Sequence, residues 1–181
     1  MGFLSWLRAA VSSTSPSPFM ARLGLHGGMV TLHWPAGTSQ LDVYLENDSP
    51  TAEEAVFYWN AQVGRRFFAP PIPPVADILR AFADPNLRPH LKGCVLVRMD
   101  LSDSDHGTTH IEYDKRTGAI INAIITLPGK SKHPAEVAKH EFAHALGLDH
   151  GPDGTLMAAH LADGPAPLAG YQARAVKGIG R

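Results

Sequence analysis

The sequence predicts an α/β (α+β) domain in which helices back one twisted mixed β-sheet. Three observations indicate this class. Short apolar or alternating segments typical of strands recur along residues 29–127, a helical segment is inserted among them, and two further helical segments follow. Strands and helices in this order build a sheet that buries its apolar face against helices. The length of 181 residues suits a single domain with short tails.

The chain is predicted to divide near residue 28. Residues 1–28 hold an apolar N-terminal segment and a linker rich in serine and proline at residues 12–18, and the domain occupies residues 29–181. The apolar segment is short, has no basic start and contains Arg8, so it makes a poor secretory signal. We expect this N-terminal segment to dock on a protein partner or on the domain itself.

Two strands and a helix are expected to open the domain. Residues 29–34 are predicted to form the first strand. Residues 41–45 alternate apolar and polar side chains, as a half-buried strand does. The helix that follows is capped by Ser49 or Thr51 and ends at Gly64, because glycine adopts the left-handed conformation that stops a helix.

The middle of the domain combines an extended connector, a short helix and a buried strand. Residues 70–74 include four prolines, which favour an extended chain. Residues 75–82 are predicted to form a short helix, and residues 93–101 a strand. Cys94 in that strand is the only cysteine, so no intramolecular disulfide can form, and we interpret it as a small core residue.

A hairpin and two helices are expected to complete the domain. Residues 108–113 and 119–127 are predicted strands, and the turn between them is rich in turn-forming residues. Residues 133–146 form the second major helix, with a proline in its first turn. A loop over residues 147–166 leads to a last helix over residues 168–177.

Charge and hydropathy argue against two classes of partner. The net charge is −1 and the isoelectric point is near 6.8, so the chain has no electrostatic attraction for nucleic acid or anionic membranes. No stretch approaches the roughly 18 consecutive apolar residues of a transmembrane helix. We therefore expect a soluble chain that either leaves the cell without a signal peptide or forms part of a larger assembly.

Two histidines at helical spacing form the centre of a predicted metal site. His140 and His144 lie four residues apart, so a helix places both imidazoles on one face, one turn apart. Glu141 adjoins the first histidine, and its carboxylate can reach a water at an open metal position and act as general base. A zinc ion that catalyses hydrolysis needs three protein ligands, so one more is required.

The third ligand is predicted to come from the turn after the helix. Gly147 tolerates the left-handed conformation that ends a helix, so the chain can reverse there. His150, three residues further on, then reaches the same ion. The five residues of this pattern have a chance rate of about one in ten thousand in a chain of this composition. The sequence therefore predicts Zn²⁺ held by His140, His144 and His150.

This run of residues resembles the metzincin clan of zinc endopeptidases, and it is most similar to the matrixin branch, which includes the matrix metalloproteinases. That family carries a methionine turn just past the third ligand, and residues 154–157 look like this turn, with Met157 as the methionine. The resemblance covers residues 30–178 in order and is specific over residues 140–157. It implies a zincin-like domain in which Gly147 and Met157 support the metal site.

The resemblance also implies how a substrate binds. In the family, the edge strand before the zinc helix pairs with an extended peptide, which makes residues 119–126 the upper rim of the cleft. This sequence departs from the family pattern in two places. The lone cysteine lies inside the domain, so latency by a prodomain cysteine is absent. Ala158, Ala159 and His160 follow the methionine, where some metzincins have a tyrosine ligand and matrixins usually have a proline.

Other polar residues are interpreted as surface groups. His106 and His110, together with Asp103 and Asp105, do not match the spacing of a metal cage and indicate a polar loop between strands. His160 is expected in a solvent-facing loop. Neither set enters the predicted metal site.

These observations lead to the hypothesis of a zinc-dependent endopeptidase acting on a protein or peptide in extended conformation. Glu141 takes a proton from the attacking water and passes it to the leaving amine. Two alternatives stay open. One is a metal-binding structural or assembly subunit of a larger particle, such as a virion, which the apolar N-terminal segment favours. The other is a zinc hydrolase of cell-wall amide bonds.

Overall fold

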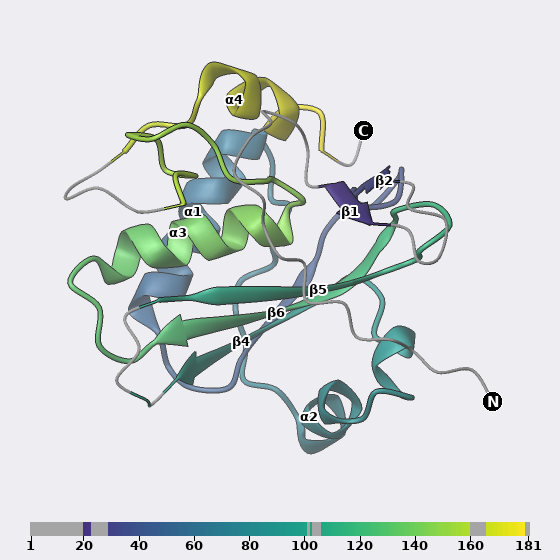
Figure 1. The fold of residues 1–181 in the computed structure, drawn as a ribbon. Coiled ribbons are helices and arrows are strands. Elements are labelled where there is room, and N and C mark those ends of the chain that lie inside the picture. Colours follow the sequence, from purple (N-terminus) through teal and green to yellow (C-terminus); the bar gives the residue numbers. More distant parts are fainter. Residues whose placement is uncertain (1–19, 23–28, 101, 103–105, 160–165, 180–181) are drawn as a thin grey trace.

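The described part of the chain is a mixed α/β structure with helices on both faces of a four-stranded sheet (Figure 1). The structure, a computed structural model, describes residues 20–22, 29–100, 102, 106–159 and 166–179. A separate two-stranded sheet pairs β1 (Met20–Arg22) with β2 (Met29–Thr31) in antiparallel orientation. The predicted α+β class is confirmed, while the apolar N-terminal segment lies outside the described residues.

The four strands of the main sheet lie in the order β3-β4-β6-β5. β3 (Asp42–Leu45) is parallel to β4 (Cys94–Asp100), and β4 is parallel to β6 (Ile120–Pro128). β5 (Thr108–Tyr113) is antiparallel to β6, so the predicted hairpin is confirmed. Parallel neighbours need long crossover connections, and the helices between β3 and β4 belong to one of them.

Beyond β6 the end strand of the sheet is β5, which corrects the assignment of residues 119–126 to the cleft rim. β6 occupies that segment and pairs with β4 on one side and with β5 on the other. Its backbone is bonded on both sides because the hairpin places β5 outside it. An extended peptide added at this side of the sheet would therefore pair with β5.

Two helices pack side by side on one face of the sheet (Figure 1). They are α1 (Pro50–Val63) and α3 (Pro134–Ala145), and α3 contacts both β6 and β5. Ser49 is the N-cap of α1, as one of the two predicted alternatives had it, and its hydroxyl accepts the Ala52 N–H at 3.3 Å. Gly64 ends α1 with φ of 78°, as predicted.

The main hydrophobic core fills the space between these two helices and the sheet. It takes large side chains from every layer, including Trp59, Phe68, Phe142 and Ile125, none of which is measurably exposed. Phe68 and Phe142 meet edge to face with ring centroids 5.2 Å apart. Burying a side chain of this size stabilises the fold by about 1.5–3 kcal/mol.

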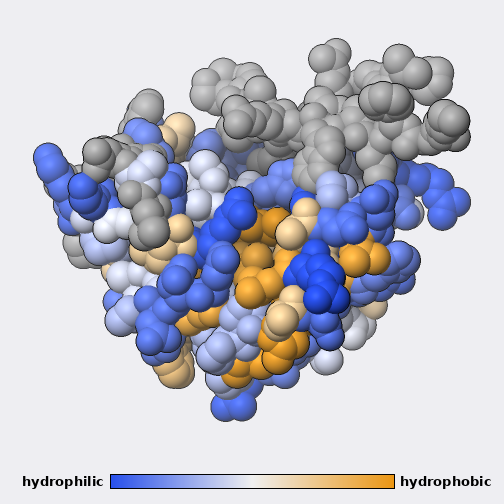
Figure 2. Space-filling model, turned by 90° about the horizontal axis from the view of Figure 1, so that it is seen from below, coloured by the Kyte–Doolittle hydropathy of each residue, from blue (hydrophilic) through white to orange (hydrophobic). Residues whose placement is uncertain are grey.

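A second, smaller apolar cluster covers the opposite face of the sheet. Phe82 of α2 (Ala76–Ala83) packs there with Cys94, Leu96 and Ile124. Figure 2 views the molecule from this side and shows apolar side chains gathered among hydrophilic ones. The sheet is thus covered on both faces, which explains the continuous burial of the first four residues of β4. Among the described helices, none is long and apolar enough to cross a membrane.

Three details differ from the sequence prediction. The proline-rich connector pairs with β3, because Ile72 donates its N–H to the Val43 carbonyl at 3.0 Å and accepts the Leu45 N–H at 2.9 Å. A short 3-10 helix, η1 (Arg88–His90), was not predicted. The last helix, α4 (Gly170–Val176), begins two residues later than expected.

Cys94 is expected to be unreactive in the folded chain. Burial, assisted by the nearby Asp42 carboxylate, raises the pKa of its thiol to about 11. At pH 8 only about one thiol in a thousand is then ionised, and the thiolate is the reactive form. Iodoacetamide at pH 8 should label the unfolded chain once and the folded chain far more slowly, as followed by intact mass. Equal labelling rates would contradict the buried position.

Candidate metal centre

α3 carries two of the predicted ligands and the predicted base on a buried face. His140, Glu141 and His144 are 6%, 6% and 8% exposed. The helix begins at Pro134, whose missing N–H costs nothing in the first turn. Because the two histidines are one turn apart on a rigid element, their separation is set by helix geometry.

Two tryptophan side chains fix the position of α3. The Trp59 indole N–H, from α1, donates to the Lys139 carbonyl at 2.8 Å. The Trp34 indole N–H donates to the Ala145 carbonyl at 2.9 Å. These two hydrogen bonds lie on either side of the ligand pair along the helix. They anchor the ligand-bearing segment to two other parts of the chain.

The helix ends in the sharp reversal predicted at Gly147. This glycine has φ of 86°, and the Leu148 N–H bonds back to the Ala143 carbonyl at 3.0 Å. A Cβ atom on Gly147 would lie 2.8 Å from the backbone oxygen of Leu32. The position therefore needs glycine for two reasons, its left-handed conformation and the close approach of another segment of backbone. The reversal brings His150 back over α3.

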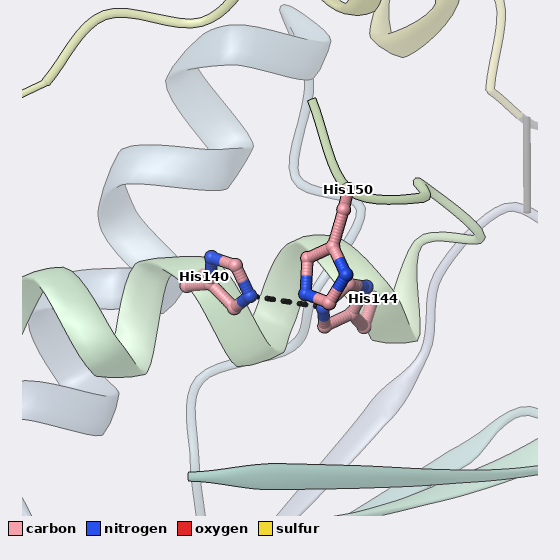
Figure 3. A group of neighbouring side chains, drawn as sticks. All are labelled: His140, His144 and His150. Atoms are coloured by element: carbon pink, nitrogen blue, oxygen red, sulfur yellow. Dashed lines mark hydrogen bonds between the residues drawn. The ribbon is translucent and has the colours of Figure 1, made fainter. Parts of the chain in front are cut away.

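The three predicted ligands converge. The potential ligand atoms of His140, His144 and His150 all lie within 4.8 Å of one another. Figure 3 shows His140 and His144 on the helix, with His150 reaching them from the returning chain. The ring centroids lie 4.6 to 5.2 Å apart. This is the arrangement that three ligands of one metal ion require.

Backbone carbonyls determine which ring nitrogens face the centre. His140 Nδ1 lies 2.8 Å from the Leu156 carbonyl oxygen, and His144 Nδ1 lies 2.8 Å from the Leu148 carbonyl oxygen. A carbonyl oxygen only accepts, so both Nδ1 atoms must donate. The Nε2 atoms of the neutral rings then carry lone pairs, and this second bond of each imidazole is typical of histidines that bind metals.

The Nε2 atoms of His140 and His144 lie close enough together to bind the same cation. They lie 3.0 Å apart, and neither carries a proton in the neutral tautomers just derived. Protonation is disfavoured, because burial lowers the pKa of His140 to about 4 and that of His144 to about 3. Two nitrogens bound tetrahedrally to one zinc ion lie about 3.3 Å apart. The donor set therefore fits a bound metal ion.

Glu141 is held by residues that the sequence analysis did not single out. The Thr109 hydroxyl, from β5, donates to Glu141 Oε2 at 2.7 Å and lies 2.9 Å from the Glu141 carbonyl oxygen. Gly107 packs so closely that a Cβ there would lie 2.6 Å from Glu141 Cγ. Burial raises the pKa of Glu141 to about 7, and the Thr109 hydrogen bond opposes the shift. No local pattern marks Thr109, which lies 32 residues away in the sequence.

The segment predicted as the methionine turn pairs with the chain just past His150. Met157 is fully buried in the main core, and its carbonyl accepts the Gly151 N–H. Gly151 also forms a parallel bridge with Ala158. This segment therefore connects the chain just past His150 to the core.

The other sequence candidates do not join the site. Among the described residues, the only group of three or more potential ligands is the histidine triad, so His106 and His110 belong to none. Asp103, Asp105 and His160 lie outside the described residues.

Comparison of the chain with protein-family models and with curated proteins returned no match. The chemistry of the site therefore has to be derived from its geometry. That geometry consists of three imidazoles around one point, with a buried carboxylate on the same helix.

Gly147→Ala is expected to destabilise the fold more than a matched glycine substitution. Gly37 has a similar φ of 82° but open space where alanine would add a methyl group, whereas Gly147 adds the contact with Leu32. Left-handed strain costs about 1–2 kcal/mol in both variants, and the clash adds to it only at Gly147. Urea unfolding of both alanine variants measures the difference. Equal losses of unfolding free energy in the two variants would show that the contact with Leu32 does not contribute.

Proposed function

We propose that this chain is a zinc-dependent endopeptidase of the metzincin type, with a matrixin-like catalytic domain. The observation that carries the proposal is the convergence of three buried or half-buried histidines from a helix and the glycine turn after it. The buried Glu141 beside His140 adds the acid–base group that hydrolysis requires. The resemblance in the sequence supplies the family, and the mixed sheet with α3 along it is compatible with a zincin-like fold.

Zinc is the metal that this donor set favours. Three neutral imidazoles suit an ion of intermediate softness, whereas Mg²⁺ and Ca²⁺ take oxygen ligands. Catalytic zinc sites use three protein ligands and keep a fourth position open. When bound, zinc polarises the scissile carbonyl and makes a water molecule acidic enough to attack near neutral pH. His140, His144 and His150 would hold it.

Glu141 is proposed to move the proton in this reaction. Its Oε2 accepts the Thr109 hydroxyl, which leaves Oε1 to take a proton from the attacking water. In the metal-free chain burial raises the pKa of Glu141 to about 7, and a raised pKa favours a carboxylate that both accepts this proton and returns it to the leaving amine. Thr109 and Gly107 hold the side chain in one position and so reduce the ordering needed for reaction.

The proposed substrate is a protein or peptide in extended conformation. β5 is an outer strand of the sheet and contacts α3, the helix that bears two of the proposed ligands. An extended peptide can pair with such an edge by strand addition. Since β5 also carries Thr109, one strand would both align the peptide and hold the base.

The first test is metal content together with cleavage. We expect one zinc per wild-type chain, measured by metal-resolved mass spectrometry, and chelator-sensitive cleavage of an unstructured protein. His150→Ala should reduce both, because two ligands remain. His90→Ala, an exposed histidine of η1, is the matched control and should change neither.

The outcomes separate the proposed activity from its alternatives. A wild-type chain without zinc would overturn the proposal. Zinc without cleavage of proteins would favour the assembly subunit. Zinc with cleavage of cell-wall fragments, and without cleavage of proteins, would favour the hydrolase of cell-wall amide bonds.

Glu141→Gln is expected to separate metal binding from turnover. The amide keeps an oxygen that can accept from Thr109, and Glu141 is not a ligand, so zinc content should stay at the wild-type level. General acid–base catalysis typically contributes about 10²–10⁴-fold, so the cleavage rate should fall by roughly that factor. Wild-type turnover in this variant would show that Glu141 is not the base.

A further inference from the structure

A buried glutamine of the last helix touches the segment that carries the third ligand. Gln172 of α4 is 2% exposed. Its Nε2 donates to the Asp149 carbonyl at 3.1 Å, and its Oε1 accepts the Ala169 N–H at 3.3 Å. Burying an amide is costly unless both of its ends are bonded. Gln172 meets this condition by linking α4 to the residue just before His150.

Gln172 also packs against the residue just after His150. A Cβ on Gly151 would lie 2.9 Å from Gln172 Nε2 and 3.0 Å from Thr155 Oγ1. The glutamine therefore contacts both neighbours of the ligand, Asp149 by a hydrogen bond and Gly151 by close packing. Glycine at position 151 is what allows this approach.

His150 needs this support more than the other two ligands do. His140 and His144 stand on a helix whose own hydrogen bonds set their separation. His150 stands on irregular chain after Gly147, so contacts from elsewhere must fix its direction. Its backbone N–H donates to the Asp149 carboxylate at 2.8 Å, but that bond joins adjacent residues and ties neither to the rest of the fold.

The helix that carries Gln172 is itself anchored. Val176 of α4 is fully buried in the main core. Arg65, at the end of α1, donates to the Ile179 carbonyl just past α4 at 3.3 Å. Just before α4, the Pro167 carbonyl accepts the Leu156 N–H at 2.9 Å. Helix α4 is therefore tied to the core and to both flanking segments, and Gln172 reaches the ligand segment from this anchored helix.

We propose that Gln172 is a positioning residue that directs His150 toward the metal, so that α4 belongs to the metal centre. This inference rests on the proposed metal site and goes beyond the ligand motif, which ends before α4 begins. Gln172 does not touch the ion. It acts through the Asp149–His150 peptide, as groups behind metal ligands do when they orient them.

The test compares metal binding in three variants with wild type. Gln172→Met keeps the length of the side chain and removes both hydrogen bonds. Gln172→Glu keeps an oxygen for the Ala169 N–H but loses the donor to Asp149. Gly151→Ala retains Gln172 but forces its side-chain amide to shift away from position 151. Arg174→Ala, an exposed residue of α4, is the control.

We expect the zinc affinity of the full chain, measured by competition with a chromophoric chelator, to fall about 10- to 100-fold in all three variants and to stay unchanged in the control. The Co²⁺-loaded variants should show a weaker or shifted visible absorption band, because His150 no longer completes the same geometry. Unfolding of each metal-free chain is measured in parallel. Gly151→Ala should still fold, because the added methyl group meets side-chain ends and no backbone, but it should lose some stability where the displaced Gln172 amide gives up its buried hydrogen bonds.

Wild-type affinity and an unaltered Co²⁺ spectrum in Gly151→Ala and either Gln172 variant would overturn the inference. Loss of affinity that only matches a loss of stability in the metal-free chain, with the Co²⁺ spectrum unchanged, would also overturn it, because it would reflect packing alone. A wild-type chain that binds neither zinc nor Co²⁺ would instead remove the proposed function. The two failures are thus distinguishable.

Discussion

The burial of α3 against α1 and the sheet is the constraint on which the rest of the site depends. Neutral imidazoles and a carboxylate are costly to remove from water, by about 1–3 kcal/mol for each polar group left without a partner. The burial of large apolar side chains in the same region, Trp59, Phe68 and Phe142 among them, offsets this cost. Tight packing then holds the helix in one position, and the indoles of Trp34 and Trp59 bond its carbonyls on either side of the ligand pair.

Burial also decides the chemistry of the polar groups. The carbonyls of Leu148 and Leu156 select one tautomer in each helical histidine and turn both Nε2 lone pairs to the same point. In water such an arrangement would be relieved by protonation, but burial disfavours the imidazolium, and the two lone pairs can instead hold a metal ion. The same desolvation raises the pKa of Glu141 toward neutrality. One physical cause therefore acts on both the proposed ligands and the proposed base.

Strand β5 forms one edge of the sheet and also contacts Glu141, the proposed base. β5 is outermost because the hairpin folds it away from β4, and its Thr109 reaches across to Glu141. In the proposed function, the strand that would align an extended peptide thus also orients the group that moves the proton. On the opposite face of the sheet, α2 and its apolar cluster close the second side of β4 and keep the parallel strands buried.

Much of the structure of this protein could be predicted from its local sequence. The helical spacing of His140 and His144, the reversal at Gly147 and the return of His150 are decided by neighbours within a few residues, so periodicity and glycine stereochemistry predicted them. The hairpin, the helix after Ser49 and the burial of Cys94 followed from the same kind of signal.

Periodicity cannot predict which strand lies at the edge, and residues 119–126 proved to be inside the sheet. Nor does it mark Thr109 or Gln172, which meet Glu141 and Asp149 across 32 and 23 residues of chain. Such contacts leave no repeating pattern, because each depends on one side chain meeting one distant group. Only the packing of whole elements against each other decided them.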